Sequence, residues 1–294
     1  MRRPLRPPRW PFAPREAMDV CSVFTSRRGV QDLASRALWT STGTAVTAAD
    51  IGPTDALVAG SPTAWDLRDT SNTSYVTLDA KGHKGRTTYT VLACGISVGA
   101  TGNDYRGVVA QMGGYRSGSG NFFRIKDNGG GLNAPIARLD LVDGGTARFV
   151  ETTLSSRVWY GDSSSHPWIL GAIVDGSTAP SVVAADLLTH ELASAAFGTW
   201  TTGPATGTNP LLVASQYTGY ANTADIALAW VCAWPRALST TEIGEIVARP
   251  WSIVEEYAAK TYFLPLVLGG GGGGGFQPAW AARSTTTIVG GGVT

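Results

Sequence analysis

The sequence is poor in cysteine and in charge, and each shortage excludes a class of protein. Its 294 residues include only three cysteines, Cys21, Cys94 and Cys232, an odd and sparse set that does not form a disulfide framework. Charged residues make up 15% of the chain and the net charge is +1, which argues against a chain-wide electrostatic grip on nucleic acid. The apolar run at 262–268 is too short to span a bilayer. We therefore expect neither a nucleic-acid partner nor a membrane partner.

The two cysteines at 94 and 232 lie in apolar, strand-like runs, TVLACGISV and LAWVCAW. Buried free thiols that act as small hydrophobic side chains are the expected state, and a disulfide between Cys94 and Cys232 stays open. The N-terminus is basic but has no apolar stretch behind it, so the sequence predicts no signal peptide and a protein made and kept soluble in a cytoplasm.

What the sequence does have is glycine, proline and short β-prone runs. Hydrophobic residues make up 43% of the chain, enough for a sizeable core, and 37 glycines with 16 prolines indicate many turns. The Val-Asp-Gly-Gly turn at 142–145 separates two alternating runs and predicts a hairpin over 136–154. Many short strands between turn residues are typical of an all-β jelly-roll sandwich. The runs are 73–80, 87–100, 105–114, 121–131, 136–145, 147–154, 167–177, 209–216 and 224–234.

One helix is signalled after the last strand. Ser239 and Glu242 have the spacing of a capping box, in which each side chain accepts a hydrogen bond from the other's backbone amide. Leu238 can pack against Ile243 as a hydrophobic staple, and Pro250 ends the helix. We expect this short C-terminal helix at the edge of the sandwich.

Both ends of the chain differ from the middle. Residues 1–36 hold eight arginines against three acids, a net charge of +5, and five prolines favour an extended arm. Seven consecutive glycines at 269–275 form a tether. The sequence thus predicts a basic Pro-rich arm (1–36), a lectin-like sandwich (37–250, core 73–248) and a C-terminal linker, tether and arm (251–294). The residues expected to dock the arms on a partner are Arg2, Arg3, Arg6, Arg9, Trp10, Phe12, Phe276 and Trp280. A disordered tail is the alternative, and nucleic-acid binding by the arginines is a third reading.

Three segments of residues 87–250 resemble the laminin-G-like, concanavalin A-like jelly-roll family. They are WILGAIVDG at 168–176, NPLLVASQ at 209–216 and ADIALAWVCAWPRALSTTEI at 224–243. ARPWSIVEEYAAKTYFLP at 248–265 is similar to the linker that follows lectin-like domains in tailed-phage and prophage proteins. The resemblance implies a jelly-roll fold in a phage virion component.

The same resemblance directs attention to metal and sugar sites. Family members that bind calcium use acidic loop residues, but no cluster or motif supports a calcium site here, and we expect no cofactor. The aspartates considered are Asp104, Asp127, Asp143, Asp162 and Asp175. For sugar binding, exposed aromatic and amide side chains are needed, and the loop 216–225 is the best-placed one, with Tyr217, Tyr220 and Asn222. Further aromatic residues with this potential are Tyr105, Tyr115, Trp159 and Tyr160.

Catalysis is not indicated. Asp140 and Glu151 are acidic residues on expected strands, but no Glu-x-Asp-x-x-Glu pattern of the related glucanases is present. Asp162, Ser164 and His166 share one loop, which does not by itself make a triad.

These observations predict a non-enzymatic bacteriophage virion structural protein. In this interpretation a lectin-like sandwich is displayed on the capsid or tail, and the arms bind other virion proteins. The protein would be present in many copies or as a homo-oligomer, in virions assembled in the bacterial cytoplasm. The alternative is a carbohydrate-binding module of the tail that adheres to host surface glycans. A glycan hydrolase is the third hypothesis.

Overall fold

The computed structural model describes residues 18–24, 32–42, 65–66, 75–79, 83, 85–97, 106–112, 122–127, 136–143, 146–154, 166–176, 179–198, 211–213 and 226–250. All of them belong to one compact unit, Met1–Ala258; a second unit, Ala259–Thr294, lies outside the described residues.

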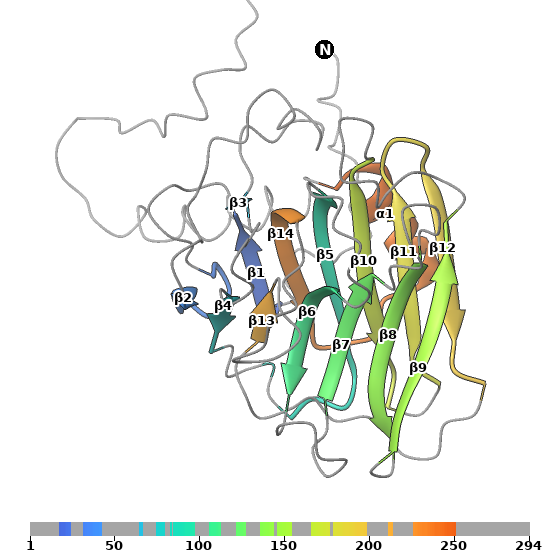
Figure 1. The fold of residues 1–294 in the computed structure, drawn as a ribbon, viewed down its shortest axis with the longest axis horizontal. Helices are drawn as coiled ribbons and strands as arrows, with labels where there is room; N and C mark the ends of the chain where they lie inside the picture. Colours follow the sequence, from blue (N-terminus) through green and yellow to red (C-terminus); the bar gives the residue numbers. More distant parts are fainter. Residues whose placement is uncertain are drawn as a thin grey trace, which may run out of the picture. The chain divides into compact units, whose positions relative to one another are not determined.

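The described residues form two antiparallel sheets and one helix, with the sheets lying face to face (Figure 1). The first sheet has the order β1-β14-β5-β10-β11-β12, with β3 also paired to β14. Its strands are β1 (Val20–Val23), β3 (Trp65–Asp66), β5 (Tyr89–Ser97), β10 (Trp168–Val174), β11 (Ser181–Asp186), β12 (Glu191–Ala196) and β14 (Ile226–Trp234).

The second sheet has the order β2-β4-β13-β6-β7-β8-β9. Its strands are β2 (Thr40–Thr42), β4 (Tyr75–Leu78), β6 (Arg106–Met112), β7 (Phe122–Asp127), β8 (Ile136–Asp143), β9 (Thr146–Thr153) and β13 (Leu211–Val213). The helix α1 spans Thr240–Ala248. This arrangement confirms the expected jelly-roll β-sandwich. It also confirms the single short helix, counted over the described residues.

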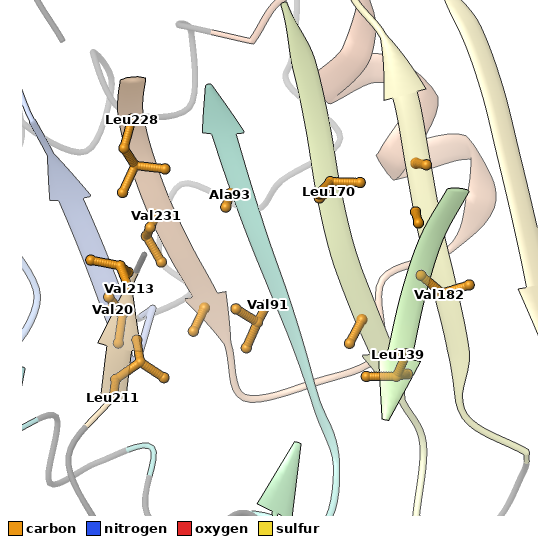
Figure 2. Packing of buried hydrophobic residues seen from close by; sticks show 14 of the residues in the cluster. Val20, Val91, Ala93, Leu139, Leu170, Val182, Leu211, Val213, Leu228 and Val231 are labelled. Carbon is orange, nitrogen blue, oxygen red and sulfur yellow. The ribbon is translucent and has the colours of Figure 1, made fainter. Parts of the chain in front are cut away.

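The main core lies between the two sheets. In the strands whose side chains are described, alternate side chains point inward, as the period of two requires (Figure 2). Val91 and Ala93 of β5 and Val231 of β14 thereby meet Leu139 of β8 and Leu211 of β13, and all five are buried. Removing apolar surface from water contributes roughly 25 cal/mol per Å² to stability. Burial of this layer is therefore the main source of the fold's stability.

A second apolar layer explains why the central strands of the first sheet are apolar on both faces. All nine residues of β14 are buried, because Cys232 and Trp234 face away from the main core. There they pack with Ile243 and Ile246 of α1. The continuous apolar run LAWVCAW is therefore a strand covered on one face by the second sheet and on the other by α1. Neither of its faces is exposed to solvent.

The sandwich begins earlier in the chain than residue 37. β1 pairs with β14 in the register Val20↔Ala233 to Val23↔Trp230. Asp32 holds the following segment against β1, since its fully buried carboxylate accepts hydrogen bonds from the Cys21 amide (2.7 Å) and the Ser22 hydroxyl (2.7 Å). Part of the segment that looks like a separate basic arm in sequence is thus a strand of the first sheet.

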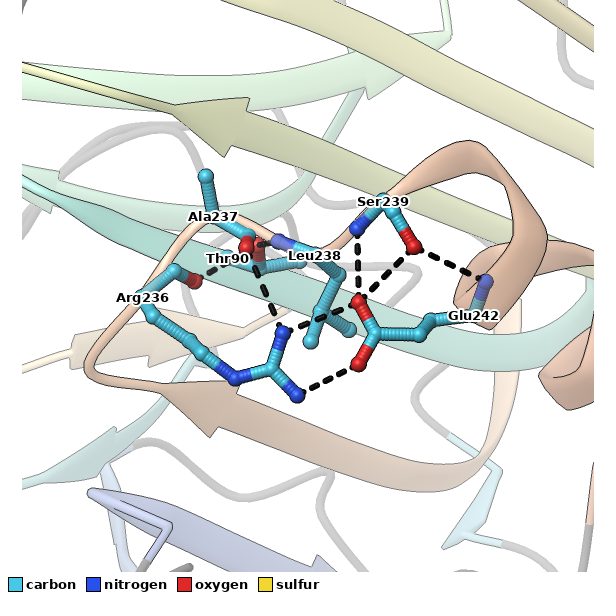
Figure 3. Close-up of polar contacts among 6 residues, drawn as sticks. All are labelled: Thr90, Arg236, Ala237, Leu238, Ser239 and Glu242. Atoms are coloured by element: carbon cyan, nitrogen blue, oxygen red, sulfur yellow. Dashed lines mark hydrogen bonds and ion pairs between the residues drawn. The ribbon is translucent and has the colours of Figure 1, made fainter. Parts of the chain in front are cut away.

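The junction of β14 and α1 is closed by a polar network (Figure 3). The expected capping box is present: the Ser239 amide donates to Glu242 Oε2 (2.8 Å), and the Glu242 amide donates to Ser239 Oγ (3.3 Å). Arg236 adds a bidentate pair, from Nη2 to Oε1 of Glu242 (2.6 Å) and from Nη1 to Oε2 (2.9 Å). The buried Thr90 hydroxyl donates to the Arg236 carbonyl and accepts from the Leu238 amide, both at 2.9 Å. The network ties the helix start to β5.

This junction makes stability depend on pH. The hydrogen bonds from Arg236 lower the pKa of Glu242 from 4.5 to about 2. A depressed folded-state pKa contributes stability above the unfolded value, and that contribution disappears as the pH falls from 4.5 to about 2. Allowing for the partly exposed Arg236, we expect about 2 kcal/mol.

Urea unfolding of wild type and Glu242→Gln at pH 6 and pH 2 measures this contribution. The gap in unfolding free energy between the two proteins is expected to close at the lower pH. Glu245→Gln, on the exposed face of the same helix, should keep the wild-type profile. A gap that is the same at both pH values would show that the ionised Glu242 is not the stabilising species.

Candidate functional site

The hairpin β8–β9 carries polar side chains on the outer face of the second sheet. Ala137, Leu139 and Leu141 point into the core. Arg138 and Asp140, at the intervening positions, therefore lie on the outer face. Strand register adds two more residues to this face, because Glu151 lies opposite Arg138 and Phe149 lies opposite Asp140. We call Arg138, Asp140, Phe149 and Glu151 the hairpin cluster.

Arg138 organises the hairpin cluster. Its Nε donates to Asp140 Oδ1 at 2.8 Å, and its Nη1 donates to Glu151 Oε1 at 3.3 Å. The guanidinium carbon also lies 3.6 Å from the centroid of the Phe149 ring. A cation over an aromatic face is worth about 0.5–1 kcal/mol at an exposed site. The hydrogen bonds to Asp140 and Glu151 thus place the guanidinium against one face of the phenyl ring.

Phe149 is the unusual member, because an aromatic ring stands on the polar face of the sheet. Its exposed fraction is 53%, whereas Asp140 is buried and the Arg138 side chain is mostly covered. The guanidinium covers one face of the ring, so the exposed surface lies on the other face and the edge. A flat apolar surface beside carboxylates is suited to a ligand with an apolar face and hydroxyl groups at its rim.

A second polar cluster ties the start of β5 to β1. Arg86 Nε and Nη2 donate to the two oxygens of Asp19, at 2.5 and 2.7 Å, and His83 Nδ1 lies 3.6 Å from Asp19 Oδ2. Burial raises the pKa of Asp19, but the contacts with His83 and Arg86 outweigh burial and lower it. The His83 ring is fully buried and packs edge-on against Tyr89. This cluster fastens segments of the fold: Asp19 and His83 are covered, and Arg86 is partly exposed.

A third cluster stabilises the turn between β11 and β12. His166 Nδ1 lies 2.6 Å from Asp186 Oδ2, and Asp186 Oδ1 accepts from the amides of Leu188 (2.7 Å) and Thr189 (3.1 Å). The fully buried Asp186 thus caps the hairpin. His166 is paired with Asp186, and its expected loop neighbours Asp162 and Ser164 lie outside the described residues.

The site residues expected from sequence fall outside what the structure describes. This holds for Tyr217, Tyr220 and Asn222, for the other aromatic residues considered for sugar binding, and for all eight arm-docking residues. They stay predictions. The hairpin cluster was missed, although alternation in RLD and FVE places all four residues on one face. From the sequence alone, Asp140 and Glu151 stand out only as acidic residues on strands.

Metal and membrane sites find no support in the described part of the chain. No three His, Cys, Asp or Glu side chains there lie close enough to hold a metal ion. Among the calcium-site aspartates, only Asp175 has a described side chain. No helix among the described residues has the length and apolar character needed to cross a bilayer. Cys21, Cys94 and Cys232 are all buried and free, as expected for small apolar side chains.

The fold is shared with solved domains of other proteins. No protein-family model and no curated protein matches the sequence. Domain 4 of an extracellular arabinanase from Geobacillus stearothermophilus, in complex with arabinotriose, is similar with a TM-score of 0.53 and 11% identity. The match covers 79% of this chain and 98% of that domain.

Botulinum neurotoxin binding domains are similar to the same degree. The serotype G domain has a TM-score of 0.53 and 11% identity over 80% of this chain, and the serotype DC domain in complex with SialylT has 0.52 and 9% over 80%. The chain spans about half the length of these two domains, 51% and 52%. At such identities the comparisons establish a common β-sandwich fold.

Proposed function

We propose that the sandwich is a non-catalytic carbohydrate-binding module and that the hairpin cluster is its binding surface. The observation that carries this proposal is the exposed Phe149 ring, fixed by Arg138 and flanked by two carboxylates. An aromatic ring can stack on the C–H face of a sugar while the partly exposed carboxylate of Glu151 accepts hydrogen bonds from its hydroxyls. The buried Asp140 contributes indirectly, by holding Arg138 against the ring. Support also comes from the domains of similar fold, which are named in complex with arabinotriose and SialylT.

The arrangement favours binding over hydrolysis. A glycosidase places two carboxylates on either side of the scissile bond, with space between them for the substrate. Here Arg138 lies between Asp140 and Glu151 and is hydrogen-bonded to both. The two carboxylates therefore support the arginine and the ring rather than flank an open cleft.

The proposal agrees with the alternative hypothesis from the sequence, a module that adheres to glycans. It agrees less well with a purely structural role in a virion. Only the terminal segments indicate a phage particle, and residues 1–17 and 251–294 lie outside the described residues. Placement on a capsid or tail, virion partners and virion localisation stay predictions.

Replacing Phe149 by alanine should weaken glycan binding about tenfold, because the stacking surface and its contact with Arg138 are lost together. The measurement is a glycan array of the full chain, followed by calorimetric titration with the best-bound glycan. Arabinotriose and sialylated oligosaccharides are included as probes. Phe149→Trp keeps a stacking surface and should retain binding.

Leu188→Ala is the matched control, since Leu188 is a similarly exposed apolar side chain (64%) in the turn between β11 and β12. It should bind as wild type. Equal binding by Phe149→Ala and wild type would place the sugar elsewhere on the molecule. If the wild type binds no glycan on the array, the proposed function itself is wrong.

A further inference from the structure

The three buried cysteines gather on one face of the first sheet. Cys21 of β1, Cys94 of β5 and Cys232 of β14 all belong to the apolar layer between this sheet and α1. β14 lies between β1 and β5, so Cys232 is next to both neighbouring strands. The arrangement raises the question of which thiols can react with each other.

Strand register brings Cys21 and Cys232 directly opposite each other. The Cys21 amide donates to Asp32 Oδ1 (2.7 Å), and its carbonyl accepts from the Leu33 amide (2.7 Å). Both main-chain groups of Cys21 therefore point away from β14, and the two cysteines form a non-hydrogen-bonded pair. The Cα atoms in such pairs are about 4.5 Å apart, within the range of about 4.4–6.8 Å found in disulfides.

The two side chains also lie on the same face of the sheet, in the apolar layer under α1. Burial and a hydrogen bond with the Cys21 thiol raise the pKa of the Cys232 thiol well above its usual value. Cys94, in contrast, lies opposite Trp230, and Cys232 lies opposite Leu92. Diagonal neighbours of this kind are about 7–8 Å apart, beyond the reach of a disulfide without movement of the backbone. The geometry selects one pair from three thiols.

We propose that Cys21 and Cys232 are a reversible thiol modification site. A low-molecular-weight disulfide, such as oxidised glutathione, converts them to a cross-strand disulfide that links β1 to β14 and leaves Cys94 free. The site is independent of the hairpin cluster, which lies on the other sheet.

The reaction is a two-step thiol–disulfide exchange. One cysteine loses its proton to solvent, and its thiolate attacks the small disulfide, releasing one small thiolate, which takes up a proton, and leaving a mixed disulfide. The second cysteine, also as thiolate, attacks the protein sulfur of the mixed disulfide and releases the second small thiol. The protein loses two hydrogens and two electrons, and the small disulfide gains them.

Access to the pair requires β1 to open, because both side chains are fully buried. β1 is a four-residue strand at the edge of the first sheet, and among the described strands it pairs with β14 alone. Opening a short edge strand needs less free energy than global unfolding. The exchange is therefore slow in the folded protein and accelerates in urea concentrations below the main unfolding transition.

The test counts free thiols in the full chain after incubation with about 10 mM oxidised glutathione. The incubation is done with and without urea at a concentration below the unfolding transition. After denaturation under acid quench, wild type is expected to fall from three free thiols to one, with a Cys21–Cys232 linkage in the peptide map. The oxidised protein should melt about 10 °C higher, because the linkage closes a very long loop.

Cysteine variants provide the controls. Cys94→Ser should fall from two thiols to none, whereas Cys21→Ser should form no intramolecular disulfide. The peptide map of the wild-type protein identifies the linked cysteines directly, so the test does not depend on whether a variant folds. Three remaining thiols in both incubations, or a Cys94–Cys232 linkage, would overturn the proposal.

Discussion

Replacing Gly95 by alanine is expected to destabilise the protein by about 3 kcal/mol or more. A Cβ at this position would lie 2.5 Å from the Ala227 carbonyl oxygen and 3.0 Å from Cη2 of Trp168. Neither neighbour can withdraw easily, since the first is backbone of β14 and the second is a fully buried indole. Gly95 also lies where the pairing of β5 with β14 shifts register, between Leu228 and Trp230.

The measurement is urea unfolding of Gly95→Ala beside Gly244→Ala. A Cβ on Gly244 has no heavy atom within 4 Å, and the residue lies inside α1. Alanine there should stabilise the protein by roughly 0.5–1 kcal/mol, as it does in helices generally. A Gly95→Ala protein as stable as wild type would show that β5 and β14 do not approach as closely as described.

The second large effect is expected at Asp32. Its fully buried carboxylate accepts four hydrogen bonds, two on Oδ1 from Cys21 and Ser22, and two on Oδ2 from the amide (2.6 Å) and hydroxyl (2.5 Å) of Ser35. Asp32→Ala leaves these donors without acceptors and should cost about 3–5 kcal/mol, since each buried unsatisfied group costs about 1–3 kcal/mol. Ser35→Ala removes a single hydroxyl donor near the surface and should cost about 1 kcal/mol.

Hydrogen exchange can show where the Asp32 effect is located. The amides of β1 (Val20–Val23) should exchange fastest in Asp32→Ala, because the carboxylate fastens this strand to the segment that follows it. Exchange in β8 should change only with global stability. Unchanged protection of β1, together with wild-type stability, would contradict the assigned role of Asp32.

Local patterns in the sequence predicted the elements that depend on local interactions. The capping box at Ser239 and Glu242 has all its partners within four residues, and the hairpin 136–154 is set by one turn, so both were found. β1 was not recognised, because VCSV is only four residues long and is buried only through its pairing with β14, more than 200 residues later. Its basic surroundings pointed to an arm instead.

The candidate site was missed for a related reason. Alternation alone places Arg138 and Phe149 on the outer face, but their contact depends on the cross-strand register of β8 and β9. The pairing of Cys21 with Cys232 likewise depends on strands at opposite ends of the chain. Spacing along the sequence does not encode such distances.

The adjacency of β1 and β14 has a mechanical consequence. Because the strands are antiparallel and Val20 pairs with Ala233, the chain enters β1 and leaves β14 at the same end of the first sheet. A load applied between these two points pulls the strands apart from one end, so their hydrogen bonds break one after another instead of sharing the force. In the reduced protein this strand pair therefore resists such a load less than it would if all its hydrogen bonds shared the force. A covalent bond between Cys21 and Cys232, one residue pair in from that end, would stop the unzipping almost where it starts.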